Sequence, residues 1–406
     1  QGRVIGVLHV GSLTTRVFTD DDGDLLQLAA DRAALAIEQA RLYEQRRVAE
    51  ALQRRLLPGR LAEGLGLEVA ARYRPAAGGT LGGDWYDVFA VPGGNVGVAV
   101  GDVVGHGVAA AAVMAQLRTA VRAYAADGHP SAGVVDRVNA LMWNLGPLAM
   151  TTLVYLVLDP ANQSLELVNA GHPPALVVTP EGPAAYLPLT GGMALGASPT
   201  ARYESSTFAL PTGSTVFLYT DGLVERRGES IDFGLERLRA IAEGASDVEA
   251  LCTTVLEGLV GDSGPTDDVA FVAARVPPVT DRLETRWPAT TESLAPIRQL
   301  LRRWLAARGA TDAETYDIVV ACQEACANAI EHAYGPGPAE FFLDAEYDGP
   351  SVTFTVRDEG AWRPPRGSDR GRGLPLMRAL MDSVDVRQSA GGTVVVLARP
   401  LLTAAA

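Results

Sequence analysis

Four short acidic motifs of this sequence combine the residue types of a divalent-cation site. They read Gly-Gly-Asp-Trp-Tyr-Asp at 82–87, Gly-Asp-Val-Val-Gly-His-Gly at 101–107, Tyr-Thr-Asp-Gly at 219–222 and Thr-Asp-Asp-Val at 266–269. An aspartate that ends an apolar strand holds its carboxylate on a fixed rim beside free backbone carbonyls, and hard cations prefer such oxygens. A single Asp-Gly pair is an ordinary turn sequence, so the metal-site hypothesis depends on the four motifs together.

The first two motifs are the ones most directly expected to meet. Asp84 and Asp102 lie 18 residues apart and bracket one apparent β-hairpin. Because the two ends of an antiparallel hairpin lie side by side, both carboxylates are expected at one edge of a sheet.

A second set of polar residues lies far from these motifs in the sequence. Glu324, Asn328 and His332 follow one another at intervals of four residues, so in a helix they share one face. A polar stripe is usually just the solvated face, but two later features favour a ligand site. Asp358-Glu359-Gly360 follows an apolar strand, and Gly371-Arg372-Gly373-Leu374 opens a helix, whose free backbone N–H groups suit a phosphate.

The elements that must position these residues follow from the apolar pattern. Short strands are predicted at 68–73, 85–91, 96–100, 152–158, 165–169, 175–179, 215–219 and 269–276. Helices are predicted at 108–126, 132–144 and about 248–260. This order indicates an α+β fold of stacked sheets with helices outside.

Pro277-Pro278 marks the next boundary. Beyond it the pattern predicts helices at about 294–307, 311–332 and 374–381, strands at 340–347 and 351–356, and a final strand pair. Thr311 and Glu314 form a capping box at the start of the second of these helices. These elements predict a second α/β domain.

The first residues are expected to belong to a third unit. Residues 4–10 read as a buried strand, and a helix capped by Thr19 or Asp20 runs to about Leu57, where Pro58 ends it. The helix fits either a two-stranded coiled coil, which would make the chain a homodimer, or a single helix packed on its own domain. We therefore expect an α+β multidomain chain divided at 1–46, 47–276 and 280–400.

The net charge and the cysteine count of the chain argue against several classes of function. The 406-residue chain has a formal net charge of −14, which disfavours binding to nucleic acid or to an anionic membrane surface. Three cysteines argue against a disulfide framework and favour the cytoplasm. The weakly charged stretch 96–117 contains Asp102, His106 and several glycines, so it is not a membrane span. The first residue is Gln within a strand pattern, so the chain looks cut from a longer one.

The order of the acidic motifs, with Asn-Ala-Gly-His-Pro-Pro at 169–174, resembles the metal-dependent PPM-type serine/threonine phosphatases of the bacterial sporulation and stress-response branch, over about 52–276. This resemblance implies a β-sandwich with a dinuclear Mg²⁺ or Mn²⁺ centre that activates water against a phosphoserine or phosphothreonine. On matching positions it implies that the metal ligands are the carboxylates of Asp84, Asp102, Asp221 and Asp267 and the carbonyl of Val103. Asp268 is expected to support these ligands without binding the metal itself. His106, His172 and Asn169 are expected to pack or to tie loops.

Residues 281–399 resemble the histidine-kinase-like ATPase fold, an α/β sandwich, and within it the small anti-sigma-factor serine kinases. The resemblance implies that Asn328 holds Mg²⁺ on ATP and that Glu324, as a second catalytic group beside the aspartates, activates the attacking hydroxyl. It implies that Asp358 and the adjoining Gly360 bind adenine, and that Gly371, Gly373 and Leu374 close on the phosphates. Ala361-Trp362 stands where many relatives carry a second glycine, which leaves the kinase activity open.

The start of the chain, to about Arg46, resembles the end of a GAF sensory domain. Together the resemblances imply a phosphatase acting on a phosphorylated anti-anti-sigma (STAS-type) protein, fused to a kinase that restores the phosphate and holds a sigma factor. One alternative is a C-terminal domain that binds ATP and sigma factor without transferring phosphate. The other, a sensor histidine kinase, needs a phospho-accepting histidine on the helix at 20–57, which has none.

Overall fold

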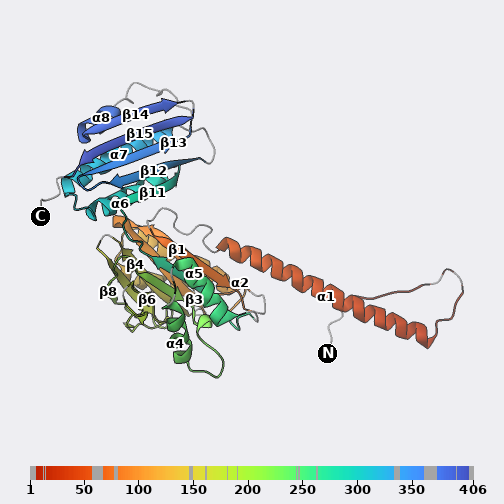
Figure 1. Ribbon diagram of the computed structural model, residues 1–406. Helices are drawn as coiled ribbons and strands as arrows, with labels where there is room; N and C mark the ends of the chain where they lie inside the picture. Colours follow the sequence, from red (N-terminus) through yellow and green to blue (C-terminus); the bar gives the residue numbers. More distant parts are fainter. Residues whose placement is uncertain are drawn as a thin grey trace.

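The computed structural model describes residues 6–56, 67–76, 81–145, 150–332, 339–360 and 373–401, apart from positions 12, 14, 161, 181, 190, 244, 246, 262–263 and 390. Figure 1 shows a long N-terminal helix and two sheet-containing parts joined near α6. None of the described helices is both long enough and apolar enough to cross a lipid bilayer.

The central part contains two five-stranded sheets. One has the order β1 (Glu68–Arg74), β10 (Val269–Arg275), β9 (Thr215–Tyr219), β6 (Leu176–Val178), β7 (Ala185–Tyr186). The other has the order β2 (Trp85–Val91), β3 (Asn95–Val103), β4 (Thr151–Asp159), β5 (Ser164–Ala170), β8 (Ser205–Ala209). All the pairings within them are antiparallel.

The two sheets pack face to face and carry helices on their outer faces. Residues that alternate along the strands, such as Val98 and Val100 of β3 with Val216 and Leu218 of β9, form the core between the sheets. Helices α2 (Val108–Ala126) and α3 (Ser131–Leu145) cover one outer face. Helices α4 (Ile231–Ala242) and α5 (Val248–Val255), the latter followed by a π-turn at Leu256–Val260, cover the other. The predicted sandwich with flanking helices is thus confirmed.

The C-terminal part has a single sheet covered by helices. Its strand order is β11 (Arg282–Pro288), β12 (Glu340–Tyr347), β13 (Ser351–Asp358), β15 (Gly392–Pro400), β14 (Ser383–Ser389). Helices α6 (Leu294–Ala306), α7 (Asp312–His332) and α8 (Gly373–Leu380) share one apolar core with it. The predicted capping box closes the start of α7, since the Thr311 N–H donates to the Glu314 carboxylate (2.8 Å). Cys322 and Cys326 are buried in this core as packing residues.

Strands β7, β8 and β11 and helix α4 were not predicted, and for β11 and α4 the structure gives the physical reason. In β11 the charged residues Arg282, Glu284 and Arg286 alternate with the others on an edge strand, so no apolar run marks it. In α4 a glycine interrupts the helical pattern, and a Cβ at Gly234 would lie 1.9 Å from the Val224 carbonyl oxygen. The glycine is therefore required by close packing, which the sequence pattern does not report.

The expectation for residues 4–10 was wrong where it can be checked. Residues 6–10 are extended chain without strand pairing, and Val7 is 75% exposed. A lone extended segment has no neighbouring strand among the described residues to satisfy its backbone or cover its side chains. The helix that follows, α1 (Asp20–Leu56), agrees with the prediction, and Thr19 caps it by accepting from the Asp22 N–H (3.3 Å). The expected stop at Pro58 lies outside the described residues.

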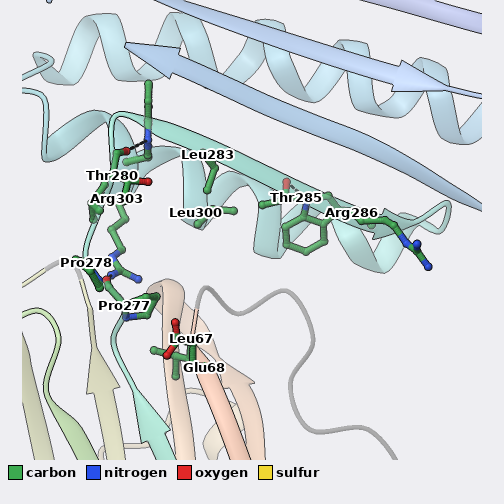
Figure 2. Close-up of a pocket in the computed structure, with 13 residues that line it drawn as sticks. Leu67, Glu68, Pro277, Pro278, Thr280, Leu283, Thr285, Arg286, Leu300 and Arg303 are labelled. Atoms are coloured by element: carbon green, nitrogen blue, oxygen red, sulfur yellow. Dashed lines mark hydrogen bonds between the residues drawn. The ribbon is translucent and has the colours of Figure 1, made fainter. Parts of the chain in front are cut away.

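The linker between the two sheet-containing parts is held by α6. Arg303 donates to the Pro277 carbonyl (2.5 Å), and the Trp304 indole donates to the Thr280 carbonyl (3.0 Å). Figure 2 shows the cavity of about 310 Å³ beside this linker, with Leu67 and Glu68 below and Arg303 above. The linker is thus packed as part of the C-terminal fold.

An ion pair between a buried aspartate and a half-exposed arginine joins α2 to β2. The Asp87 side chain is fully buried and accepts two hydrogen bonds from Arg122, from Nε at 3.0 Å and Nη2 at 2.5 Å. The Arg122 guanidinium also lies over the Phe89 ring, 5.2 Å from its centroid. Within the described part of the chain, this bidentate contact supplies the one ion-pair partner of a carboxylate that would otherwise be buried without a compensating charge.

We predict that Arg122→Ala lowers the free energy of unfolding by about 3 kcal/mol, because it strands a buried carboxylate. Urea denaturation followed by circular dichroism measures the change. Arg137→Ala is the matched control, since Arg137 is an exposed arginine of α3 bonded only to Gly133 within its own helix. Equal stability of the two variants would contradict the prediction.

Candidate functional site

Asp84 and Asp102 meet at one end of the β2–β3 hairpin, as predicted. The register pairs Trp85 with Gly101, so the two aspartates flank the last rung on the two strands. They share a hydrogen bond, and burial together with the neighbouring Asp102 charge raises the pKa of Asp84 well above its usual range. Burial is also the main cause that raises the pKa of Asp102. The pair therefore has a strong need for a compensating positive charge.

The third and fourth motifs bring further carboxylates to the same place from the other sheet. Asp221 follows β9 and Asp267 precedes β10, two strands that are paired in the sheet. Burial, with the charges of Asp102 and Asp267, raises the pKa of Asp221 to about 6. Asp268 is buried, and its Oδ1 accepts from the Ala76 N–H (2.8 Å). Asp267 is exposed, so it is the freer of the two neighbours.

The alternation of side chains explains why these residues converge. Asp84 continues the series Tyr86 and Val88 on β2, which faces the core between the sheets, and Asp102 continues Val98 and Val100 on β3. The polar cluster is thus the end of the inter-sheet core, where apolar residues give way to carboxylates.

Glycines let the backbone close around this cluster. A Cβ at Gly83 would lie 2.2 Å from the Val103 carbonyl oxygen, and the Val103 N–H donates to the Gly83 carbonyl (3.3 Å). The carbonyl expected as a ligand therefore lies directly against the first acidic motif.

The donor set fits a hard divalent cation by its chemistry. It consists of carboxylate oxygens with one adjacent backbone carbonyl, and Oδ2 of Asp84 is buried without a hydrogen-bond partner in the described part of the chain. Within that part, no three carboxylate, imidazole or thiol groups are arranged closely enough to form a ready metal cage. The carboxylates instead interact with one another in the pairs described above.

His172 and Asn169 have the packing roles that were expected. The Asn169 amide donates to the His172 carbonyl (2.8 Å), and its Oδ1 accepts from the His172 N–H (2.9 Å). The His172 ring is buried, and burial lowers its pKa to about 3, so the ring is neutral. His106 is exposed on the loop after Asp102.

In the C-terminal part, Glu324 and Asn328 come together with the start of α8. A Cβ at Gly373 would lie 2.9 Å from Glu324 Oε2 and 3.6 Å from Asn328 Nδ2. The first turn of α8 thus faces the polar stripe of α7, and the free backbone N–H groups of a helix start are chemically suited to a phosphate.

Asp358 ends β13 and is fixed by two backbone donors. Its Oδ1 accepts from the N–H groups of Gly360 (3.1 Å) and Thr393 (3.2 Å). Burial raises its pKa. A Cβ at Gly392 would lie 2.0 Å from the Asp358 carbonyl oxygen, so β15 passes as close as a chain can. Both of these backbone hydrogen bonds go to the same carboxylate oxygen of Asp358.

Some predicted site residues cannot be placed. Gly371, and the loop at 361–372 that contains Ala361 and Trp362, lie outside the described residues, as does the His332 side chain. Leu374 is described and is 36% exposed on α8.

Two contacting residues were missed by sequence reasoning. The Thr220 side chain contacts Asp84 across the two sheets, and the Tyr73 hydroxyl contacts Asp268. Burial raises the pKa of both carboxyls, and each of these hydrogen bonds offsets part of that rise. Thr220 stands inside the third acidic motif, a signal that could have been used. Tyr73 lies in β1 with no sequence signal.

Comparison with known proteins agrees with this arrangement. Residues 92–277 match the family described as Stage II sporulation protein E (SpoIIE), and residues 287–399 match the histidine kinase-like ATPase domain. The GAF-like remnant at the start lies outside both matches and is not confirmed.

Individual relatives match each part. Phosphoserine phosphatase RsbP of Bacillus subtilis (strain 168) is 27% identical over 154 residues, which are 37% of this chain and 38% of RsbP. Serine-protein kinase RsbW of the same bacterium is 33% identical over 132 residues, which are 28% of this chain and 82% of RsbW. The chain thus spans about two fifths of the length of RsbP.

One solved structure matches both parts together. The RsbU and RsbW domains of Rv1364c from Mycobacterium tuberculosis are 34% identical to this chain, over 82% of this chain and 93% of that one, with a TM-score of 0.50. The combination of the two domains in one chain is therefore a known one. The chain belongs to the family in which a SpoIIE-type, RsbU-like phosphatase domain is followed by an RsbW-like histidine kinase-like ATPase domain.

Proposed function

We propose that this protein is a metal-dependent serine/threonine phosphatase for a phosphorylated anti-anti-sigma protein, fused to an ATP-binding serine kinase of the anti-sigma type. The two activities would set the availability of a sigma factor. The observation that supports this best is the convergence of Asp84, Asp102, Asp221 and Asp267 from two sheets onto one edge. We further propose the boundaries 1–46, 47–276 and 280–400 for the functional units.

In the phosphatase, Asp84, Asp102, Asp221, Asp267 and the Val103 carbonyl would hold Mg²⁺ or Mn²⁺. A cation held there would supply charge that lowers the pKa of a water molecule and that offsets the charge of the phosphoryl group. Asp84 and Asp102 hold their oxygens rigidly because the β2–β3 register fixes both strand ends. The Asp268 carboxylate accepts a hydrogen bond from the Ala76 N–H. It would thereby fix the turn that carries Asp267.

In the kinase, Asn328 would hold the Mg²⁺ that accompanies ATP, and Glu324 would accept the proton of the attacking serine hydroxyl. Asp358 would accept from the adenine amino group through the oxygen that Gly360 and Thr393 do not occupy. The start of α8, with Gly373 and Leu374, would approach the phosphates together with Gly371. Such transfer depends chiefly on positioning and charge neutralisation.

The alternative, in which the C-terminal domain binds ATP and sigma factor without transferring phosphate, rests on Ala361-Trp362, which stands where many relatives carry a second glycine. The sensor histidine kinase alternative is disfavoured, because α1 contains no histidine to accept a phosphoryl group.

The long helix supports a homodimer. Leu25, Leu28 and Leu35 of α1 are 69%, 55% and 60% exposed, and Figure 1 shows α1 lying apart from both sheet-containing parts. An apolar stripe of this kind is typical of a two-stranded coiled coil.

We predict that Asp102→Asn lowers the rate of phosphoserine hydrolysis at least about 100-fold at equal metal, because it removes a ligand charge. Asp127→Asn, at the exposed end of α2, is the matched control and should keep full activity. The assay is release of phosphate from a phosphorylated anti-anti-sigma protein. Full activity of Asp102→Asn would remove this residue from the metal centre.

We predict that Gly373→Ala weakens ATP binding by about 10-fold or more, because its methyl group would displace the Glu324 carboxylate. The control is Gly391→Ala, whose Cβ has no atom nearer than the Ser389 hydroxyl oxygen at 3.8 Å. Titration with a fluorescent ATP analogue measures both, and phosphatase activity should not change. Unaltered ATP affinity in Gly373→Ala would contradict the proposed site.

We predict that Glu324→Gln abolishes transfer of labelled phosphate from ATP to the anti-anti-sigma protein while ATP remains bound, because the amide cannot accept the serine proton. Equilibrium binding and phosphorylation are measured on the same preparation. If the unaltered protein binds ATP but transfers nothing, the binding-only alternative is correct.

We predict that the double substitution Leu28→Asp and Leu35→Asp converts a dimer to a monomer, because charges replace the apolar contact between two copies of α1. Sedimentation velocity of the full chain gives the mass. A monomeric unaltered protein would show that α1 does not pair.

A further inference from the structure

The His172 ring is a buried bridge between the two sheets. Its Nδ1 lies 2.7 Å from the Thr152 hydroxyl oxygen, and its Nε2 lies 2.9 Å from the Tyr219 carbonyl oxygen. A carbonyl can only accept, so Nε2 carries the hydrogen and Nδ1 accepts from Thr152. Both nitrogens are satisfied, and the ring is 3% exposed. His172 therefore contacts neither solvent nor substrate.

The two partners of the ring lie beside proposed metal ligands on different sheets. Thr152 of β4 is paired directly with Asp102 of β3. Tyr219 is the last residue of β9, and Asp221 follows two residues later. The ring thus spans from the strand next to Asp102 to the strand end that carries Asp221.

The position of the ring is itself fixed by its loop. Asn169 holds both the N–H and the carbonyl of His172. The preceding Gly171 has φ +71°, and a Cβ there would lie 2.9 Å from the Ala194 nitrogen. The loop contacts therefore fix the position of the His172 ring between the two sheets.

The strand end beyond Tyr219 is secured on its other side as well. The Thr220 hydroxyl accepts from the Ala270 N–H (2.9 Å), and the Thr220 N–H donates to the Ala270 carbonyl (2.9 Å). Those bonds stay within one sheet, whereas the His172 bond crosses to the other. The His172 ring and the Thr220 contact with Asp84 are therefore two links between the sheets here, and His172 is the one that connects the strand beside Asp102 to the strand end before Asp221.

We propose that His172 is a positioning residue for the metal centre, which sets the separation between the Asp102 side and the Asp221 side through Thr152 and the Tyr219 carbonyl. This inference rests on the proposed phosphatase function. Groups behind metal ligands typically change metal affinity or activity 10- to 100-fold when they are altered.

The test is isothermal titration of the full chain with Mn²⁺ alone. His172→Phe, which fills the space and removes both hydrogen bonds, should raise the Mn²⁺ dissociation constant about 10-fold or more. Thr152→Val, which removes one hydroxyl at equal volume, should raise it by a smaller factor. His172→Gln, whose amide can both donate and accept, should recover part of the loss. The double variant of His172→Phe and Thr152→Val should be no worse than His172→Phe, because both remove one bridge.

Controls separate this proposal from folding and from the proposed function. Circular dichroism identifies variants that do not fold, and Thr152→Val decides the question if His172→Phe is one of them. His129→Phe, at the exposed end of α2, should leave Mn²⁺ binding unchanged. Unchanged Mn²⁺ affinity in folded His172→Phe and in Thr152→Val overturns the positioning role. Absence of Mn²⁺ binding and phosphoserine hydrolysis in the unaltered protein overturns the proposed function instead.

Discussion

Mutual repulsion among carboxylates at one end of the sandwich is the constraint on which the central part of this protein depends. Two unit charges about 4 Å apart repel by roughly 4 kcal/mol near a protein surface, a large share of the ~5–15 kcal/mol that stabilises a domain. Burial is the largest cause that raises the pKa values of Asp84, Asp102 and Asp221, and the charges of neighbouring carboxylates add to it. Only a rigid scaffold, a bound cation or a proton can hold such a cluster together.

The sandwich supplies that rigidity by local devices around the cluster. Gly83 lets the backbone of the first motif lie against Val103, and Thr220 and His172 secure the end of β9. Farther from the cluster, Arg122 of α2 donates to the buried Asp87 of β2, and this contact fixes the position of α2 against the strand. The carboxylates are thus held by strand register and hydrogen bonds rather than by mobile loops.

The C-terminal part uses a different solution for a different ligand. Its polar groups lie on one stripe of α7 and at the end of β13, and the start of α8 closes over them at Gly373. A nucleotide is negatively charged, so several carboxylates would repel it. A site for it therefore needs backbone N–H donors and a few oriented polar side chains. The two sites share no described residue, and α6 holds the linker that joins them.

The local sequence pattern was sufficient to predict those strands and helices whose apolar residues and glycines lie close together in the sequence. The strands at 85–91 and 215–219 and the helix at 108–126 have the predicted bounds, because apolar runs and glycines mark them clearly. The pairing of Asp84 with Asp102 also followed from the sequence, because one hairpin joins them. The edge strand β11 and the helix α4 could not be predicted from the sequence. Exposed charged residues interrupt the apolar pattern of β11, and a glycine required by packing interrupts that of α4.

Tertiary structure alone decided what crosses from one sheet to the other. Nothing local places Asp221 and Asp267 beside Asp102, because the contact depends on how two sheets stack, and only the resemblance to a family suggested it. The same holds for Thr220 against Asp84, and for His172, whose motif by itself indicated a packed turn. The segment at 6–10 shows the converse, because an apolar run becomes a strand only when a neighbouring strand accepts its hydrogen bonds. The sequence by itself determined which residues end the strands, whereas the folded chain determined which strand ends face each other, because hydrogen bonds and packing between distant segments have no local signature.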